Sequence, residues 1–139
     1  MPIVYQVNPP LTTADFIDIL RRSTLGARRP LQDLYAMEQM FLHGNTYVGA
    51  YDGAKLVGIA RVMTDFVYTS YLSDLAVDEQ YQRQGIGKQM IIEVQKAIPN
   101  AKIILLAAPA AEDYYPKIGM HHHAHCFTLA SHEELMQHD

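Results

Sequence analysis

The chain has 139 residues, of which 49% are hydrophobic and 19% are charged, and its formal net charge at pH 7 is −4. These values exclude an intrinsically disordered chain, and the acidic total speaks against a nucleic-acid-binding protein, which usually carries a basic stripe. A chain of this length can bury its own hydrophobic core, so we expect a single domain over residues 1–139.

The sequence offers no candidate for a membrane segment or a disulfide bond. Its longest apolar run, residues 103–108, is far shorter than the ~18 residues that a membrane-spanning helix needs. The first residues lack the charged and apolar pattern of a signal peptide. The single cysteine, Cys126, can form no intramolecular disulfide bond. We therefore expect a cytoplasmic protein with no membrane partner.

The first half of the chain predicts strands and helices in alternation. Asp52 and Gly53, which lie between two apolar stretches, are typical of a tight hairpin turn. Pro30 is typical of the first turn of a helix, and Gly26 and Gly44 are typical of helix ends. The predicted elements are a strand over 3–7, helices from Thr12 or Thr13 to Gly26 and from Pro30 to Gly44, and strands over 46–51, 55–64 and 70–77.

The second half predicts a helix with an apolar stripe, followed by a strand, a helix and a last strand. The continuous apolar segment 102–108 is typical of a strand that is covered on both faces. We predict a short helix over 110–118, a strand over 120–129 and a final turn capped near Ser131. The order indicates a mixed sheet with helices on its faces, an α/β fold. The stripe consists of Ile86, Met90, Ile91, Val94 and Ile98.

The most informative segment is residues 75–88, with the sequence LAVDEQYQRQGIGK. A strand ends there at Val77, and a loop with two glycines leads into the helix. The first N–H groups of a helix have no intrahelical partner and attract anions, and glycines let a phosphate approach the backbone. Arg83 and Lys88 add positive charge. The segment therefore predicts a phosphate site, although its spacing differs from that of a P-loop or a dinucleotide fingerprint.

This segment resembles motif A of the GNAT superfamily of acyl-CoA-dependent N-acyltransferases, whose pattern is [QR]-x-x-G-x-[GA]. Residues 111–120, AEDYYPKIGM, are similar to a second segment of that family, A-x-x-[FL]-Y-x-K-x-G-F. The resemblance covers roughly residues 3–129 and implies a mixed, mostly antiparallel central sheet flanked by helices. It departs from the family at Ala108, where many members carry asparagine, and at Met120, where phenylalanine is usual.

The resemblance implies that acetyl-CoA is the cosubstrate. In this family, motif A holds the diphosphate of coenzyme A, mostly through main-chain N–H groups. The strand that ends at Val77 would splay from the strand over 102–108, and the pantetheine arm would lie between them along Leu75, Ala76 and Val77. The Val77 N–H would then polarise the thioester carbonyl. The corresponding cradle residues are Arg83, Gln84, Gly85, Ile86, Gly87 and Lys88.

The proposed reaction also needs a general acid and a general base, and the sequence offers candidates for both. Tyr115 matches the family tyrosine that contacts the cofactor and protonates the leaving thiolate. Asp74 is the first candidate for the general base, because a carboxylate within an apolar strand needs a reason; a structural or substrate-anchoring role is the alternative. Asp65 and Glu112 are lesser candidates, each more typical of a solvated surface.

The resemblance to the GNAT superfamily implies direct attack of a primary amine on the thioester. The acceptor would be a small-molecule or peptide amine, and homodimers are frequent in the family. The alternative is a non-catalytic module that binds acyl-CoA for sensing or assembly.

Two clusters fall outside the motifs. On a strand over 120–129, His121, His123 and His125 would share one face, where they could hold a metal ion or contact the substrate, although we expect no metal. Cys126 would be a small buried strand residue. Four arginines around the junction of the first two helices form either a solvated basic turn or a contact for an anionic acceptor group; they are Arg21, Arg22, Arg28 and Arg29.

Overall fold

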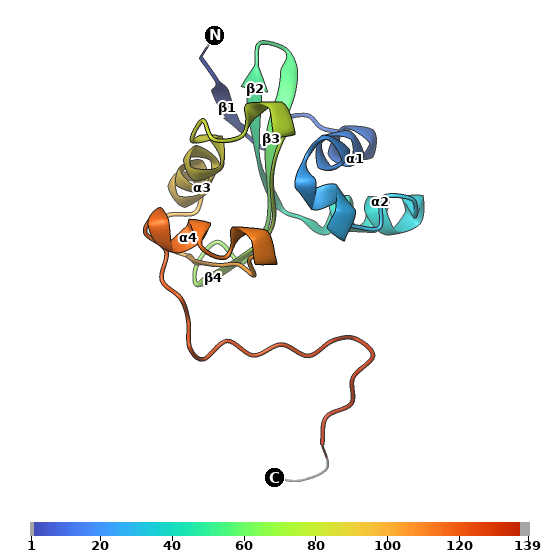
Figure 1. Cartoon of the computed structure of the whole chain (residues 1–139), viewed down its shortest axis with the longest axis vertical. Coiled ribbons are helices and arrows are strands. Elements are labelled where there is room, and N and C mark those ends of the chain that lie inside the picture. The colour runs from blue at the N-terminus through green and yellow to red at the C-terminus, as the bar shows by residue number, and fades with distance from the viewer. Residues whose placement is uncertain (1, 137–139) are drawn as a thin grey trace. The chain divides into compact units, whose positions relative to one another are not determined.

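A computed structural model describes residues 2–136 of the chain (Figure 1). The chain forms two compact units, Met1–Leu106 and Ala107–Asp139. The helices of the first unit are α1 (Thr13–Arg22), the 3₁₀ helix η1 (Thr24–Arg28), α2 (Leu34–His43), the 3₁₀ helix η2 (Glu79–Tyr81) and α3 (Ile86–Ala97). Its strands are β1 (Val4–Val7), β2 (Thr46–Asp52), β3 (Lys55–Thr64), β4 (Thr69–Val77) and β5 (Lys102–Ile104).

Within the described residues, the strands form one sheet in the order β1-β2-β3-β4-β5. The first four strands pair antiparallel, and β5 pairs parallel to β4. Figure 1 shows α1 and α2 on one side of this sheet and α3 on the other. The predicted α/β fold with a mixed, mostly antiparallel sheet is therefore confirmed.

Each face of the sheet has its own apolar contacts. On one face, Phe16 and Ile19 of α1 pack with Met37 of α2 and Ile59 of β3, and all four are fully buried. The predicted stripe of α3 is buried as expected, and Met90 contacts the backbone at Gly58 so closely that a Cβ there would lie 3.1 Å from the Met90 methyl group. Burial of these apolar side chains is the main stabilising contribution to the fold.

Local hydrogen bonds explain where α1 and α2 begin. Thr12 and Asp15 form a capping box, in which the Asp15 N–H donates to Thr12 Oγ1 over 3.1 Å. The predicted helix start at Pro30 is wrong, because α2 is capped by Asp33, whose Oδ1 accepts the Ala36 N–H over 3.0 Å. Residues 24–28 form η1 instead of continuing α1.

The predicted buried strand over 102–108 is shorter and more exposed than expected. Strand β5 comprises only Lys102–Ile104, and the side chains of Ile104 and Leu106 are 42% and 55% exposed. Only three of its residues pair with β4, so the segment lacks the two-sided coverage that its composition suggests.

The second unit contains two short helical pieces, η3 (Pro109–Ala111) and α4 (Tyr114–Lys117), where one helix over 110–118 was predicted. The predicted strand over 120–129 is wrong, because residues 120–136 form neither helix nor strand. The hydrogen bonds described there are local, such as the Glu133 N–H to the Ala130 carbonyl over 3.0 Å. A strand needs a partner to satisfy its backbone, and none is paired with this segment in the described residues. No helix over residues 2–136 is long and apolar enough to cross a membrane.

Candidate active site

The outer edge of β4 is open over its second half. Strand β5 pairs with β4 only from Thr69 to Tyr71, whereas β3 pairs with β4 as far as Val77. The Asp78 N–H bonds the Val57 carbonyl across that ladder. Because bonded and non-bonded residues alternate along an antiparallel pair, the peptide groups of Leu75 and Val77 face the open edge. An extended ligand can add to such an edge as a strand does.

The pairing of β4 with β3 contains a β-bulge close to the point where β4 separates from β5. Arg61 is opposite Asp74 and Val62 is opposite Leu72, so Ser73 is an extra residue in β4. A bulge bends its strand and increases the local twist. The bulge follows Tyr71, the last residue paired with β5, by two positions, so the bend accompanies the separation of β4 from β5.

Asp74 is buried beside this bulge and is enclosed by two arginines. Its residue exposure is 1%, and its Oδ1 lies 2.6 Å from Arg29 Nε, while its Oδ2 accepts from Arg61 Nε. Leu72 and Ala76 share its buried face, as the sequence predicted. Both carboxylate oxygens are therefore engaged by guanidinium groups, and these contacts favour the structural alternative over a general base.

The same two arginines also bind the bulged residue. Arg29 donates to the Ser73 carbonyl over 2.9 Å, and Arg61 donates to Ser73 Oγ over 3.0 Å. Arg61 further donates to the Met40 carbonyl at the end of α2. We call Arg29, Arg61, Ser73 and Asp74 the bulge clamp. It links the connection between α1 and α2 to the point where β4 opens.

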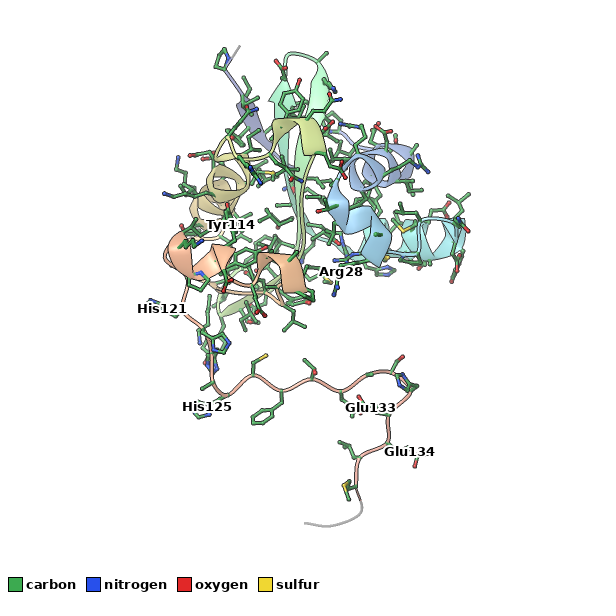
Figure 2. The ribbon with its side chains drawn as sticks, in the orientation of Figure 1. Arg28, Tyr114, His121, His125, Glu133 and Glu134 are labelled. Carbon is green, nitrogen blue, oxygen red and sulfur yellow. The ribbon has the colours of Figure 1, made fainter. Side chains whose placement is uncertain are left out.

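The arginine cluster predicted from the sequence thus divides into two pairs. Arg29 is bonded to the carboxylate of Asp74 in β4, and Arg22 is bonded to that of Asp78, the residue after β4. Arg21 and Arg28 are exposed, and no ion pair is found for either within residues 2–136. Figure 2 labels Arg28 on the connection between α1 and α2. Only this second pair remains available to an anionic acceptor group.

Asp65, a lesser candidate for the general base, also has its side chain bonded within the protein. Its Oδ1 accepts the N–H groups of Val67, Tyr68 and Thr69 at 2.8 to 3.1 Å, which fixes the turn between β3 and β4. These bonds, led by that from Tyr68, lower the pKa of the Asp65 carboxyl. The carboxylate therefore acts in the turn.

The start of α3 has the properties of an anion cradle. Gly85 caps the helix with φ +80° and provides no side-chain acceptor, so the first N–H groups of α3 stay available. A Cβ built on Gly85 would meet no atom within 4 Å, so there is room for a phosphate above its backbone. Arg83 and Lys88 are exposed beside this space, whereas the Ile86 side chain is buried and anchors the helix. This chemistry fits the diphosphate of coenzyme A.

In the second unit, Tyr115 lies in α4 and is partly buried. Its ring packs edge to face against Tyr114, with 5.2 Å between the ring centroids. Burial, and to a smaller extent Tyr114, raises the pKa of the Tyr115 phenol above its ordinary value of 10. The hydroxyl therefore keeps its proton at neutral pH, as a general acid must.

The histidine segment does not form the arrangement that the sequence suggested. His121, His123 and His125 do not share a strand face, because this exposed part of the chain forms no strand and turns at Ala124 and His125 (Figure 2). Within residues 2–136, no three histidine, cysteine or acidic side chains are placed to hold a metal ion. His123 Nδ1 accepts the His125 N–H over 3.0 Å. Cys126 is exposed and not in a strand, so the expectation of a buried strand residue is wrong.

Comparison with known proteins identifies the family. Residues 24–127 match the acetyltransferase (GNAT) domain family. The chain is 32% identical over 68 residues to GCN5-related N-acetyltransferase 2, chloroplastic, from Arabidopsis thaliana; the match covers 47% of this chain and 26% of that protein. The chain spans about half or less of the length of the curated relatives it matches.

Two solved structures share the fold. A PaiA N-acetyltransferase from Thermoplasma acidophilum in complex with coenzyme A has a TM-score of 0.63, with 16% identity over 84% of this chain and 88% of that one. An aminoglycoside acetyltransferase from an uncultured soil metagenomic sample, in complex with sisomicin, has a TM-score of 0.65, with 18% identity over 92% and 96% of the two chains. Together with the match over residues 24–127, these findings show that the chain belongs to the GNAT acetyltransferase family.

Proposed function

We propose that this protein transfers the acetyl group of acetyl-CoA to the nitrogen of a primary amine. One observation carries the proposal: the same segment, residues 75–88, supplies both outward-facing peptide groups on the open edge of β4 and an uncapped helix start with room at Gly85. An extended arm ending in a diphosphate matches this pair of features. The single catalytic domain over residues 1–139 is part of the proposal.

The cradle would hold the diphosphate through the N–H groups of residues 83–88, with Arg83 and Lys88 adding charge. The peptide groups of Leu75 and Val77 would pair with the amides of the pantetheine arm. Ala76 lies between them, and its own peptide groups face β3, so it would set the spacing and make no direct bond.

The chemistry is a direct transfer. The amine nitrogen bonds to the acetyl carbon, the carbon–sulfur bond breaks, and the sulfur takes the proton of Tyr115. The nitrogen releases its surplus proton to solvent water, and Tyr115 regains a proton from solvent, so the products are the amide and the free thiol. The Val77 N–H donates to the thioester oxygen, where negative charge develops. We assign Asp74 to the bulge clamp, in which it positions β4, because both of its carboxylate oxygens are bonded to arginines.

The acceptor would be a small-molecule or peptide amine. The net charge of −4 favours cationic acceptors through long-range attraction. An aminoglycoside acetyltransferase of the same fold is solved in complex with sisomicin, which supports a small-molecule acceptor. The transfer as proposed uses no metal ion.

Release of free thiol from acetyl-CoA, measured against amines, aminoglycosides, polyamines and peptides, tests the proposal. We expect one class to give turnover that depends on Tyr115. If the protein binds acetyl-CoA and releases no thiol with any acceptor, the alternative of a non-catalytic acyl-CoA-binding module is correct.

A further inference from the structure

The loop between β4 and α3 is held by side chains that lie far from it in the sequence. Residues 82–85 are exposed, and two residues there, Arg83 and Gly85, have left-handed backbone angles of φ +64° and +80°. Such angles are unfavourable for arginine and persist where the surrounding structure fixes them. The conformation that exposes the α3 N–H groups therefore depends on how the loop is anchored.

The buried anchor is Asp78, the first loop residue. Its Oδ2 lies 2.6 Å from an Arg22 nitrogen, and its Oδ1 accepts the Gln80 N–H over 2.8 Å. Arg22 also donates to the Leu56 carbonyl over 2.7 Å, so α1, β3 and the loop meet at one guanidinium. Asp78 is only 4% exposed. This contact is part of the folded core, and its removal would disturb the fold.

The second anchor is only partly buried and lies nearer to the cradle along the chain. The Tyr81 hydroxyl donates to Asp52 Oδ2 over 2.6 Å. Asp52 is the last residue of β2, at the hairpin turn, and Lys55 of β3 lies with its Nζ atom 5.2 Å from the centre of the Tyr81 ring. The hairpin between β2 and β3 is therefore bonded to the loop at Tyr81, four residues before Gly85. The Lys55 Nζ atom also lies 4.0 Å from Asp78 Oδ2, so the two anchors adjoin.

Little else fixes the loop between Tyr81 and the cradle. Gln82 donates to the Val77 carbonyl over 3.2 Å. Among residues 2–136, no side-chain hydrogen bond is found for Arg83 or Gln84. Within the described residues, Gln82 bonds only β4, the strand from which the loop departs, so Tyr81 is the last side chain before α3 that bonds the loop to the hairpin between β2 and β3.

We propose that Asp52 and Tyr81 are positioning residues for the cofactor diphosphate: the hairpin between β2 and β3 holds the loop in the conformation that presents the α3 N–H groups. This role rests on the proposed function, since it assumes that the diphosphate binds at Gly85. The pair contacts the loop and not the cofactor, so it acts on affinity for the nucleotide end and leaves the reacting end unchanged.

The test compares Tyr81→Phe, Asp52→Asn and the double variant with the wild-type protein. Tyr68→Phe is the matched control, since it makes the same chemical change at an exposed tyrosine in the turn before β4. Loss of the hydrogen bond is expected to raise the Kd for coenzyme A about threefold to tenfold in each single variant. The double variant should lose no more than either single one, because both changes break the same bond.

A truncated donor separates positioning from general damage. Acetylpantetheine carries the thioester and the arm without the nucleotide diphosphate, so turnover with it should be equal in the wild type and the variants. Equal Kd values for coenzyme A in all proteins would overturn the role of the pair. An equal loss with both donors would show a structural effect alone. If the wild type does not bind coenzyme A, the proposed function itself fails and this role fails with it.

Discussion

The Nε atom of Arg29 lies 2.6 Å from Oδ1 of Asp74, although the two residues are 45 positions apart in the chain. This ion pair joins the connection between α1 and α2 to β4, at the bulge where β4 leaves β5. The region that would line the acceptor side is therefore tied directly to the strand that would hold the thioester. Arg29 belongs to the arginine cluster that the sequence suggested as a contact for an anionic acceptor group, but it bonds Asp74 within the protein.

Asp74→Asn is predicted to destabilise the protein by about 3–5 kcal/mol, because it leaves the buried charge of Arg61 without its partner. Chemical denaturation measures this free energy of unfolding. Asp113→Asn, at an exposed position, is the control and should change it little. A variant at Asp74 that keeps wild-type stability and loses turnover would instead support its role as the general base.

Tyr115→Phe is predicted to lower kcat about 100-fold or more, because the leaving thiolate loses its proton donor. The KM for acetyl-CoA should stay close to the wild-type value, since the ring and its packing on Tyr114 are kept. Steady-state thiol release gives both constants. Tyr114→Phe is the paired control, and a similar loss in that variant would remove the special role of Tyr115.

Val77→Pro is predicted to lower kcat on the order of 100-fold by removing the N–H that would bind the thioester oxygen. That N–H faces the open edge of β4, so its loss leaves the ladder with β3 intact and proline is tolerated there. Val77→Ala retains the N–H and should keep most of the activity. Thermal unfolding of the two variants checks that the proline has not disrupted the strand.

Stability should fall in acid because of Asp78. Burial alone would raise the pKa of its carboxyl, but the Gln80 N–H and the Arg22 and Lys55 charges outweigh burial, so the pKa lies below the ordinary value of 3.8. A lowered pKa in the folded state means that the stabilising contribution is complete above the unfolded value and is lost as the pH falls through the folded one. Unfolding measured between pH 6 and about pH 2 should show this loss.

In Asp78→Asn, the acid-dependent loss should shrink relative to the wild type, since the titrating carboxyl has gone. An identical pH dependence in both proteins would exclude Asp78 as its source.

The sequence predicted the structural elements that depend on neighbouring residues and missed those that depend on contacts between residues far apart in the chain. The apolar stripe of α3 and the hairpin between β2 and β3 follow from local patterns, and both are confirmed, with the turn residues at Gly53 and Ala54 instead of Asp52 and Gly53. Pro30 was misleading because Asp33 offers a better cap three residues later. The strands over 102–108 and 120–129 could not be judged, since a strand exists only where another backbone pairs with it.

The candidate site shows the same division. The cradle at Gly85 and the open edge at Val77 were predicted, because the motif that carries them is continuous in the chain. The bulge clamp and the loop anchors were missed, because Arg29, Arg61 and Asp52 bond partners that lie 45, 13 and 29 positions away in the chain. Asp78 gave one local signal: an aspartate two residues before Gln80 is typical of a side-chain-capped turn.

Calorimetric titration of coenzyme A into the wild type and into Gly85→Trp tests the central claim most directly. A Cβ at Gly85 would meet no atom within 4 Å, so a tryptophan would fill the proposed diphosphate site without contacting the core, while the left-handed backbone there strains any side chain. We predict that the wild type binds coenzyme A and that the variant, still folded by circular dichroism, does not. Equal binding by both proteins would contradict a cofactor site at the start of α3.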